Sequence, residues 1–423
     1  MLILKGMVSL MKRWMTLIGM LVFAASLGAS PAWSQDVVIG FSGPLSGPGA
    51  AYAQDCANGV EMALREINED GGITVQGKPY RFRLERLDDR TDPTQAVSNA
   101  NRFVAQYKTP VVFNPNYTAI GALLRVNQFP GSQFLLVAYS SVHTFHHQGN
   151  QLVINPTTPY LLNIKALSDL AWRKGWRSGA MVVTLGAYGD AWRTDFKAHW
   201  EKKMGGTILG DFPANYYTET DLSSQLTAAI ATKTDFLLIG GPSATSALAV
   251  EQARVLGFKG GFILTDQARM DHVARVLRGK HLEEMIGVAG VADLPLPLSR
   301  SFRRKYENLY KRPVTWEVAL HYHTMHLIAK AMQKADSVVD PHAIRAAMAS
   351  VLPAVGDEYP SELFGIDDTG VIHCGGAIQS VENGKFSKVD YIFSFPKTKQ
   401  EFDKVKKLSK TREPEHILWL PVQ

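Results

Sequence analysis

The chain has 423 residues, of which 46% are hydrophobic and 20% are charged, so it can bury more than one compact core. The formal net charge is +6, and Lys5, Lys12 and Arg13 supply three of these charges within the first 34 residues, leaving +3 (6 minus 3) for the rest. A charge this small and dispersed argues against nucleic acid as a partner.

The first 34 residues have the pattern of a secretory signal peptide. Lys12 and Arg13 precede an apolar run at residues 14–27, and the small residues Ala32 and Ser34 mark a cleavage site. We expect cleavage near Ser34 and export to the periplasm. A membrane anchor is the alternative, but the run is short for a bilayer-spanning helix, and no later segment reaches that length.

After residue 35, short apolar runs alternate with segments of helical spacing. Strands are predicted at residues 37–41, 80–87, 111–113, 134–138, 179–183, 235–239 and 262–264, and helices at 54–69 and 93–106. Gly71 and Gly72 follow the first helix as a C-cap does, and Pro93 lies in the first turn of the second. This alternation predicts an α/β fold with parallel sheets and right-handed crossovers.

The loops that follow the strands are the candidate site, because ligands of such sheets bind outside the carboxyl ends of the strands. They span residues 42–52, 114–118, 139–143, 186–190, 240–243 and 265–267. The first loop, S-G-P-L-S-G-P-G, matches neither common phosphate-binding motif, and its prolines remove backbone donors. With no nucleophile–base pair and no G-x-S-x-G elbow, we assign no catalytic residue and no cofactor. A triad assembled by the fold alone stays an alternative.

Cysteines and histidines are the remaining candidates for special chemistry. Cys56 and Cys374 can pair in an oxidising compartment, but we expect two separate buried thiols. His323 and His326 would share one face of a helix, so a metal site is an alternative. No acidic or cysteine ligand at suitable spacing completes it, and we expect a packing helix and no metal.

Six motifs occur together along the chain. V-I-G-F-S-G-P-L-S-G (38–47) is followed by N-G-V-E-M-A-L-R-E-I-N-E-D-G-G-I (58–73), D-D-R-T-D-P-T-Q-A-V (88–97), A-Y-G (187–189), T-D-L-S (220–223) and Q-A-R-V-L-G-F-K (252–259). Through them the chain resembles the type I periplasmic binding proteins of the branched-chain amino acid (leucine/isoleucine/valine) class. These proteins are solute receptors of ABC transporters, and the resemblance covers nearly the whole mature chain.

The resemblance implies two Rossmann-like lobes with parallel central sheets, joined by a three-strand hinge. Lobe 1 would hold residues 36–157 and 287–360, and lobe 2 would hold residues 158–286 and 361–423. The lobes would close on a small amino acid or related carboxylate by hinge motion. The expected partners are this ligand and an inner-membrane ABC permease, and the protein would be a monomer.

The resemblance also implies ligand contacts. Tyr52 would cover an apolar part of the ligand, and Thr118 would hold its carboxylate. Ser141 would contribute a backbone contact, and Tyr188 matches a tyrosine of the second lobe. Asp266 would pair with the ligand ammonium in place of a longer glutamate. Simpler roles stay open, since Thr118 and Asp266 can each cap a helix.

Two positions depart from the family's pattern. Val142 replaces a threonine that helps to hold the ammonium, and a tyrosine contact falls near Ser243. Tyr117, Tyr139 and His143 would enlarge the aromatic share of the pocket. Strict leucine specificity is therefore not expected, and an aromatic acid is an alternative ligand. A ligand-sensing module of a membrane receptor system is the alternative function.

Overall fold

The computed structural model describes residues 36–47, 49–143, 149–277, 281–356 and 359–421. The predicted signal peptide, residues 1–34, and its cleavage point lie outside these residues. Among the described residues, no helix is both long and apolar enough to cross a lipid bilayer.

The first sheet is parallel, as predicted, with strand order β4-β1-β5-β6-β7. Its strands are β1 (Val37–Gly43), β4 (Phe82–Asp88), β5 (Val111–Asn114), β6 (Leu135–Ala138) and β7 (Val153–Ile154). Side chains alternate between its two faces. Phe113 and Val137 pack under α2 (Ala50–Glu69) and α11 (Trp316–Lys334), whereas Val112 and Leu136 pack under α3 (Pro93–Tyr107) and α4 (Tyr117–Leu123).

The second sheet is larger and has the order β18-β17-β15-β12-β11-β10-β8-β9, with β16 paired to β15. Its strands are β8 (Ser178–Val183), β9 (Thr207–Asp211), β10 (Phe236–Gly240), β11 (Gly261–Leu264), β12 (Met285–Val288), β15 (Gly376–Glu382), β16 (Lys385–Phe386), β17 (Asp390–Phe393) and β18 (Ile417–Trp419). The part from β9 to β12 is parallel, as predicted, but β15 runs antiparallel to β12 and β17 antiparallel to β15.

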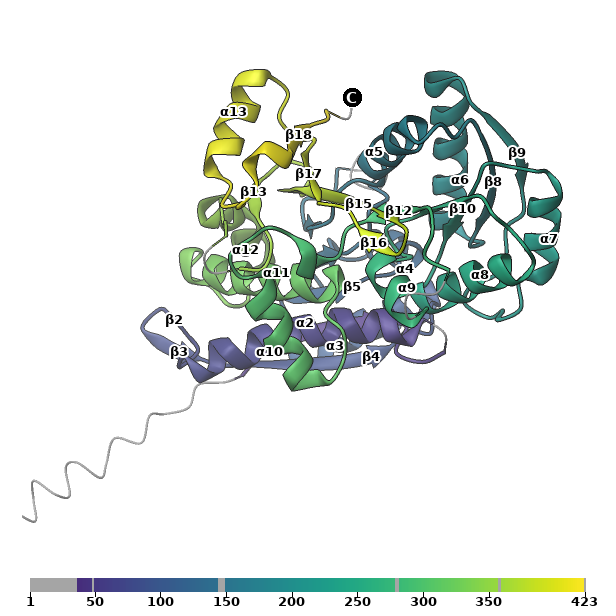
Figure 1. The fold of residues 1–423 in the computed structure, drawn as a ribbon. Coiled ribbons are helices and arrows are strands. Elements are labelled where there is room, and N and C mark those ends of the chain that lie inside the picture. Colours follow the sequence, from purple (N-terminus) through teal and green to yellow (C-terminus); the bar gives the residue numbers. More distant parts are fainter. Residues whose placement is uncertain (1–35, 48, 144–148, 278–280, 357–358, 422–423) are drawn as a thin grey trace, which may run out of the picture.

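Helices cover both faces of the second sheet. They are α5 (Tyr160–Arg173), α6 (Ala187–His199) and the π-helical turn η2 (Trp200–Met204) on one face, and α7 (Ser223–Ala231), α8 (Ser243–Val255) and α9 (Met270–Val276) on the other. Figure 1 shows this teal unit beside the unit built on the first sheet. Each unit therefore has its own core.

The remaining elements are short or complete the first unit. They are β2 (Ile73–Val75), β3 (Lys78–Tyr80), η3 (Val291–Asp293), α10 (Ser299–Tyr310), α12 (Pro341–Ala347), η4 (Met348–Val351), β13 (Leu363–Ile366), β14 (Ile372–Cys374), α13 (Lys399–Leu408) and η5 (Pro414–His416). The strand predicted at 80–87 is divided, because β3 ends at Tyr80 in a hairpin and β4 begins at Phe82. The helix predicted from residue 54 begins four residues earlier, at Ala50.

The chain crosses between the two units after β7, after β12 and after β14. Leu363 and Ile372 pack in the core of the first unit, and Val371 pairs with Asn155 beside β7. The strand that follows, β15, belongs to the second sheet. We therefore propose moving the lobe boundary expected at residue 361 to about residue 375, and keeping the other proposed lobe boundaries.

The C-terminal segment is built into the molecule. Phe402 on α13 and Ile417 on β18 are each 5% exposed and pack in the cluster that holds the core of the first unit. Phe402 also stacks on Trp419, with ring centroids 5.8 Å apart. These contacts give the tail a structural role that its sequence did not indicate.

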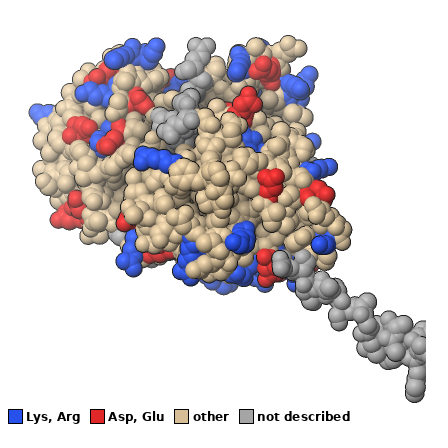
Figure 2. All heavy atoms as spheres, turned by 180° about the vertical axis from the view of Figure 1, so that it is seen from behind, with Lys and Arg blue, Asp and Glu red and all other residues tan. Residues whose placement is uncertain are grey.

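Helices α2 and α11 pack against each other in the first unit. Gly59 allows this approach, since a Cβ there would lie 2.4 Å from the carbonyl oxygen of Val318. By contrast, Gly121 on α4 faces open space, because a Cβ at that position would have nothing within 4 Å. Lys and Arg side chains are interspersed with Asp and Glu on the face shown in Figure 2.

Candidate ligand-binding site

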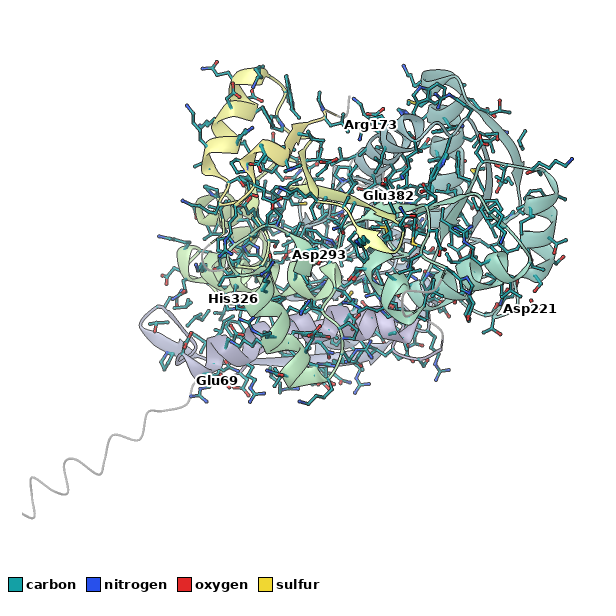
Figure 3. The ribbon with its side chains drawn as sticks, in the orientation of Figure 1. Glu69, Arg173, Asp221, Asp293, His326 and Glu382 are labelled. Carbon is teal, nitrogen blue, oxygen red and sulfur yellow. The ribbon has the colours of Figure 1, made fainter. Side chains whose placement is uncertain are left out.

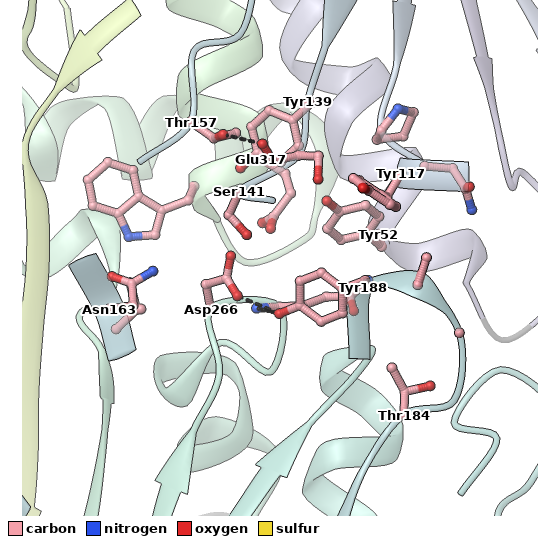
Figure 4. Close-up of a pocket in the computed structure, with 18 of the residues that line it drawn as sticks. Tyr52, Tyr117, Tyr139, Ser141, Thr157, Asn163, Thr184, Tyr188, Asp266 and Glu317 are labelled. Atoms are coloured by element: carbon pink, nitrogen blue, oxygen red, sulfur yellow. Dashed lines mark hydrogen bonds between the residues drawn. The ribbon is translucent and has the colours of Figure 1, made fainter. Parts of the chain in front are cut away.

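A cavity of about 450 Å³ lies between the two units, where the carboxyl ends of strands from both sheets meet. Side chains from both units point into it (Figure 4). The first unit contributes Tyr52, Thr91, residues 115–118 and 139–141, and Trp316, Glu317 and Leu320. The second contributes Asn163, residues 184–188, Asn215, Tyr217, Thr218, Asp266 and Gln267, and the segments that join the units contribute Thr157, Thr158, Val288 and residues 375–377.

Most of the residues expected to contact ligand line this cavity. They are Tyr52, Tyr117, Thr118, Ser141, Tyr188 and Asp266, and Tyr139 lies among them. They come from several different loops and helix starts, and the two sheets bring them together. Their role in ligand binding stays a prediction.

Val142, His143 and Ser243 do not line the cavity. Val142 is 1% exposed and packs in the core of the second unit. A ring nitrogen of His143 lies 3.1 Å from the Thr157 hydroxyl, and the Ser243 hydroxyl accepts a hydrogen bond from Arg269 at 2.6 Å. We therefore propose a site without these three residues, because each side chain is used in packing or in another hydrogen bond.

Five tyrosines give the cavity an aromatic wall: Tyr52, Tyr117, Tyr139, Tyr188 and Tyr217. The rings of Tyr52 and Tyr139 lie 6.4 Å apart. Burial raises the pKa of Tyr52, Tyr139 and Tyr188 well above the ordinary value, so their hydroxyls stay protonated. The wall therefore offers both apolar ring faces and neutral hydrogen-bonding groups.

Asp266 lies at the centre of the cavity, where Tyr188 donates a hydrogen bond to its carboxylate (Figure 4). Burial raises the pKa of this carboxyl above its usual value, and the neighbouring Ser141 and Tyr188 hydroxyls counteract part of the effect. The described lining residues include no lysine or arginine. A ligand cation is the natural partner for this carboxylate, because a buried charge needs a counter-charge.

The alternative capping roles of Thr118 and Asp266 are wrong. Helix α4 is capped by Asn116, whose side-chain oxygen accepts the Ala119 N–H at 3.0 Å, and Thr118 is exposed within the cavity. Helix α9 has Arg269 at its N-cap position, without a side-chain cap. Both side chains are thus available to a ligand.

Sequence reasoning missed Glu317, Trp316 and Tyr217. Glu317 and Trp316 open helix α11, far in sequence from any strand-end loop, and Tyr217 follows the edge strand β9, which the sequence did not reveal. One signal was present, since Glu317 is the single acidic residue of this helix and lies in its first turn. Only the fold shows that this turn faces the cavity.

A family model described as periplasmic binding protein matches residues 36–385. The chain belongs to this family.

Other comparisons agree with the membership. The Leu/Ile/Val-binding protein homolog 3 of Brucella melitensis is 28% identical over 262 residues, which are 58% of this chain and 67% of that protein. The Leu/Ile/Val-binding protein BraC3 of Rhizobium johnstonii is 43% identical over 80 residues, so the chain spans only 21% of the length of that relative.

Two solved structures show the same fold. LivJ of Streptococcus pneumoniae, a branched-chain amino acid transporter substrate-binding protein in complex with isoleucine, superposes with a TM-score of 0.70 at 18% identity, covering 85% of this chain and all of that one. An ABC transporter solute-binding protein of Rhodopseudomonas palustris, in complex with benzoate, superposes with a TM-score of 0.71 at 14% identity. The superposition covers 84% of this chain and 95% of that one.

His323, His326 and the two cysteines of this periplasmic binding protein take part in packing. His323 stacks on Tyr359 with ring centroids 3.9 Å apart, and a ring nitrogen of His326, which Figure 3 labels, lies 3.7 Å from the Glu66 carboxylate. Cys56 and Cys374 are separate buried thiols, as predicted. Within the described residues no three His, Cys, Asp or Glu side chains come together as metal ligands.

Proposed function

We propose that this periplasmic binding protein captures a small amino acid between its two lobes and delivers it to an inner-membrane ABC permease. The single observation that supports this proposal is Asp266, a half-buried carboxylate at the centre of a cavity whose described lining residues include no lysine or arginine. An amine on the ligand would provide the missing positive charge.

The ligand carboxylate would be held by neutral donors. The Thr118 hydroxyl is exposed in the cavity, and Ser141 lies on the side of Asp266 that faces the first unit (Figure 4). The aromatic wall favours a side chain with an apolar or aromatic surface. An aromatic acid without an amine would meet the Asp266 carboxylate without a partner, and we expect it to bind more weakly than the matching amino acid.

Binding would proceed by hinge motion. A ligand that contacts both lobes stabilises the closed form by as much as it prefers that form over the open one. The Tyr52 side of the cavity belongs to the proposed lobe 1, and the Tyr188–Asp266 side to the proposed lobe 2. We propose that the protein acts as a monomer in the periplasm after cleavage near Ser34.

The test is to identify the bound ligand and then measure its effect. Protein purified without denaturation is unfolded, and the released small molecules are identified by mass spectrometry. A thermal-shift screen then compares amino acids with their amine-free analogues, such as phenylalanine with 3-phenylpropanoate. We expect an amino acid to raise the melting temperature, because a ligand bound only by the folded state stabilises it. A response to the amine-free acids alone would contradict the proposal.

A further inference from the structure

Arg269 joins the two lobes from a buried position. It lies between β11 and α9 in the second unit, where its Nη2 donates to Ser243 of α8 at 2.6 Å. Its Nη1 reaches into the first unit, 2.8 Å from the Asp55 carboxylate on α2 and 3.1 Å from the Glu317 carboxylate on α11. Both ionic contacts join the two units, so a hinge motion that separates the units at this point would break them, whereas the contact with Ser243 lies within one unit.

The three charged side chains are hidden from water. Arg269, Asp55 and Glu317 are 3–5% exposed at their side chains, so solvent screens their interaction very little. Burial alone would lower the pKa of Arg269, but the carboxylates of Glu317 and Asp55 raise it above its ordinary value. Arg312 adds a second positive charge, 3.0 Å from Asp55. In this arrangement the two acids and the two arginines therefore balance each other in charge.

The same contact sets the charge of the cavity. Glu317 lines the cavity as Asp266 does, so these are its two lining carboxylates among the described residues. The guanidinium of Arg269 is directed at Glu317 and Asp55, and it neutralises Glu317. A ligand in the closed cavity thus meets one uncompensated carboxylate, that of Asp266.

We propose that Arg269 is a positioning and specificity-determining residue. It latches lobe 2 onto Asp55 and Glu317 of lobe 1 in the closed form, and it cancels the charge of Glu317 so that the cavity selects a ligand with one amine over a ligand with two. The second part rests on the proposed function, whereas the latch does not.

The latch is tested without ligand by trapping the closed form. One cysteine is placed in α4 and one in α6, helices of the two units that contact each other, and the rate of disulfide formation is measured. Because the cross-link accumulates even from a rarely visited closed form, the ratio of rates reports the ratio of closed populations. We expect Arg269→Gln to slow trapping at least about tenfold, since removing one partner leaves buried charges unpaired.

Arg275→Gln is the matched control. Arg275 lies on α9 and pairs at 2.8 Å with Asp271 of the same helix, with its side chain 39% exposed. It should trap at the wild-type rate. Adding Glu317→Gln to Arg269→Gln should restore much of the rate, because the buried negative charge is removed as well. Packing alone would not produce this rescue. An unchanged rate in Arg269→Gln, or a double variant as slow as the single one, would overturn the latch.

Folding is checked by circular dichroism, and Glu317→Gln alone serves if Arg269→Gln does not fold. In this variant Arg269 keeps its contact with Asp55 and loses the ion pair with residue 317. We expect a trapping rate between the wild-type rate and one tenth of it, and trapping at the wild-type rate would count against the latch.

Calorimetry with norleucine and lysine tests the charge role, because these ligands differ by a second amine. Arg269→Gln should shift the preference toward lysine at least about tenfold, by exposing a second carboxylate.

An unchanged preference in Arg269→Gln would overturn the charge role. If wild-type protein responds to no amino acid in the thermal-shift screen, the proposed amino-acid function fails, while the trapping result still decides the latch.

Discussion

Replacing Asp266 by asparagine removes one negative charge from the centre of the cavity and little else. Asparagine has nearly the same shape, and its side-chain oxygen can still accept the hydrogen bond from Tyr188. In the ligand-free protein we expect no loss of stability, because burial already disfavours the charged form of this carboxyl and raises its pKa. The effect should therefore appear in binding alone.

The size of the effect follows from the position of Asp266. Removing one partner of a buried, hydrogen-bonded charge pair costs about 2–5 kcal/mol of binding free energy. Asp266 is half-buried and keeps a neutral hydrogen-bond partner in Tyr188. The expected cost in binding free energy therefore lies at the lower end of this range. We expect a loss of about 2–3 kcal/mol, or a Kd about 30- to 150-fold larger for an amino acid.

The assay is isothermal calorimetry with the amino acid that the thermal-shift screen identifies, at constant pH and ionic strength. Asp195→Asn is a matched control, because Asp195 also accepts a hydrogen bond from a tyrosine, Tyr160, in the same lobe but outside the cavity. It should leave Kd within about twofold of wild type, as expected for a site without ligand contact. Equal affinity of Asp266→Asn and wild type for the amino acid would refute the reasoning.

Three further predictions concern stability. His321 is buried, and burial lowers the pKa of its imidazole to about 3. In the unfolded chain the same group takes up a proton near pH 6.5. Protonation therefore favours the unfolded chain, and the folded protein loses stability as the pH falls from 6.5 toward 3. Between pH 7 and 5 the loss in the free energy of unfolding is about 2 kcal/mol. His321→Asn should therefore flatten the pH dependence of the urea midpoint. An equally steep curve in the variant would count against this role of His321. Gly59→Ala should destabilise by about 1–3 kcal/mol because its Cβ would meet the backbone of α11, whereas Gly121→Ala, in open space, should not lower the melting temperature; equal melting of the two variants would contradict the argument. Ending the chain at Lys397 removes two buried apolar side chains worth about 1.5–3 kcal/mol each, so the melting temperature should fall sharply, whereas ending it at Trp419 should change it little; a stable protein without residues 398–423 would show that the tail is dispensable.

Local sequence patterns predicted the fold well where neighbours along the chain decide the structure. The apolar run after residue 36 forms the buried strand β1, and the helix predicted at Pro93 begins there, with Asp92 as its cap. The motif-rich loops after the strands contain most of the expected cavity residues. Strand-to-helix alternation also identified the parallel core of both sheets, because the crossover connection requires it.

Patterns were weaker where partners lie far apart in sequence. The antiparallel addition of β15 and β17 to the second sheet depends on chain reversal after residue 375, which no local period reports. Ser243 was expected at the ligand and instead holds Arg269, since the arginine reaches it only after β11 and α8 have packed. Glu317 was overlooked because its place at the cavity depends on the docking of α11 against α2.

By itself, the sequence determined most strands of the parallel cores, two helices and the family, since these depend on apolar periodicity, turn residues and contiguous motifs. Only the tertiary structure decided which carboxylates face the cavity and which one is neutralised. Charge compensation acts through space over a few ångströms, and here the partners, Asp55, Arg269 and Glu317, are separated by hundreds of residues along the chain or lie on different lobes.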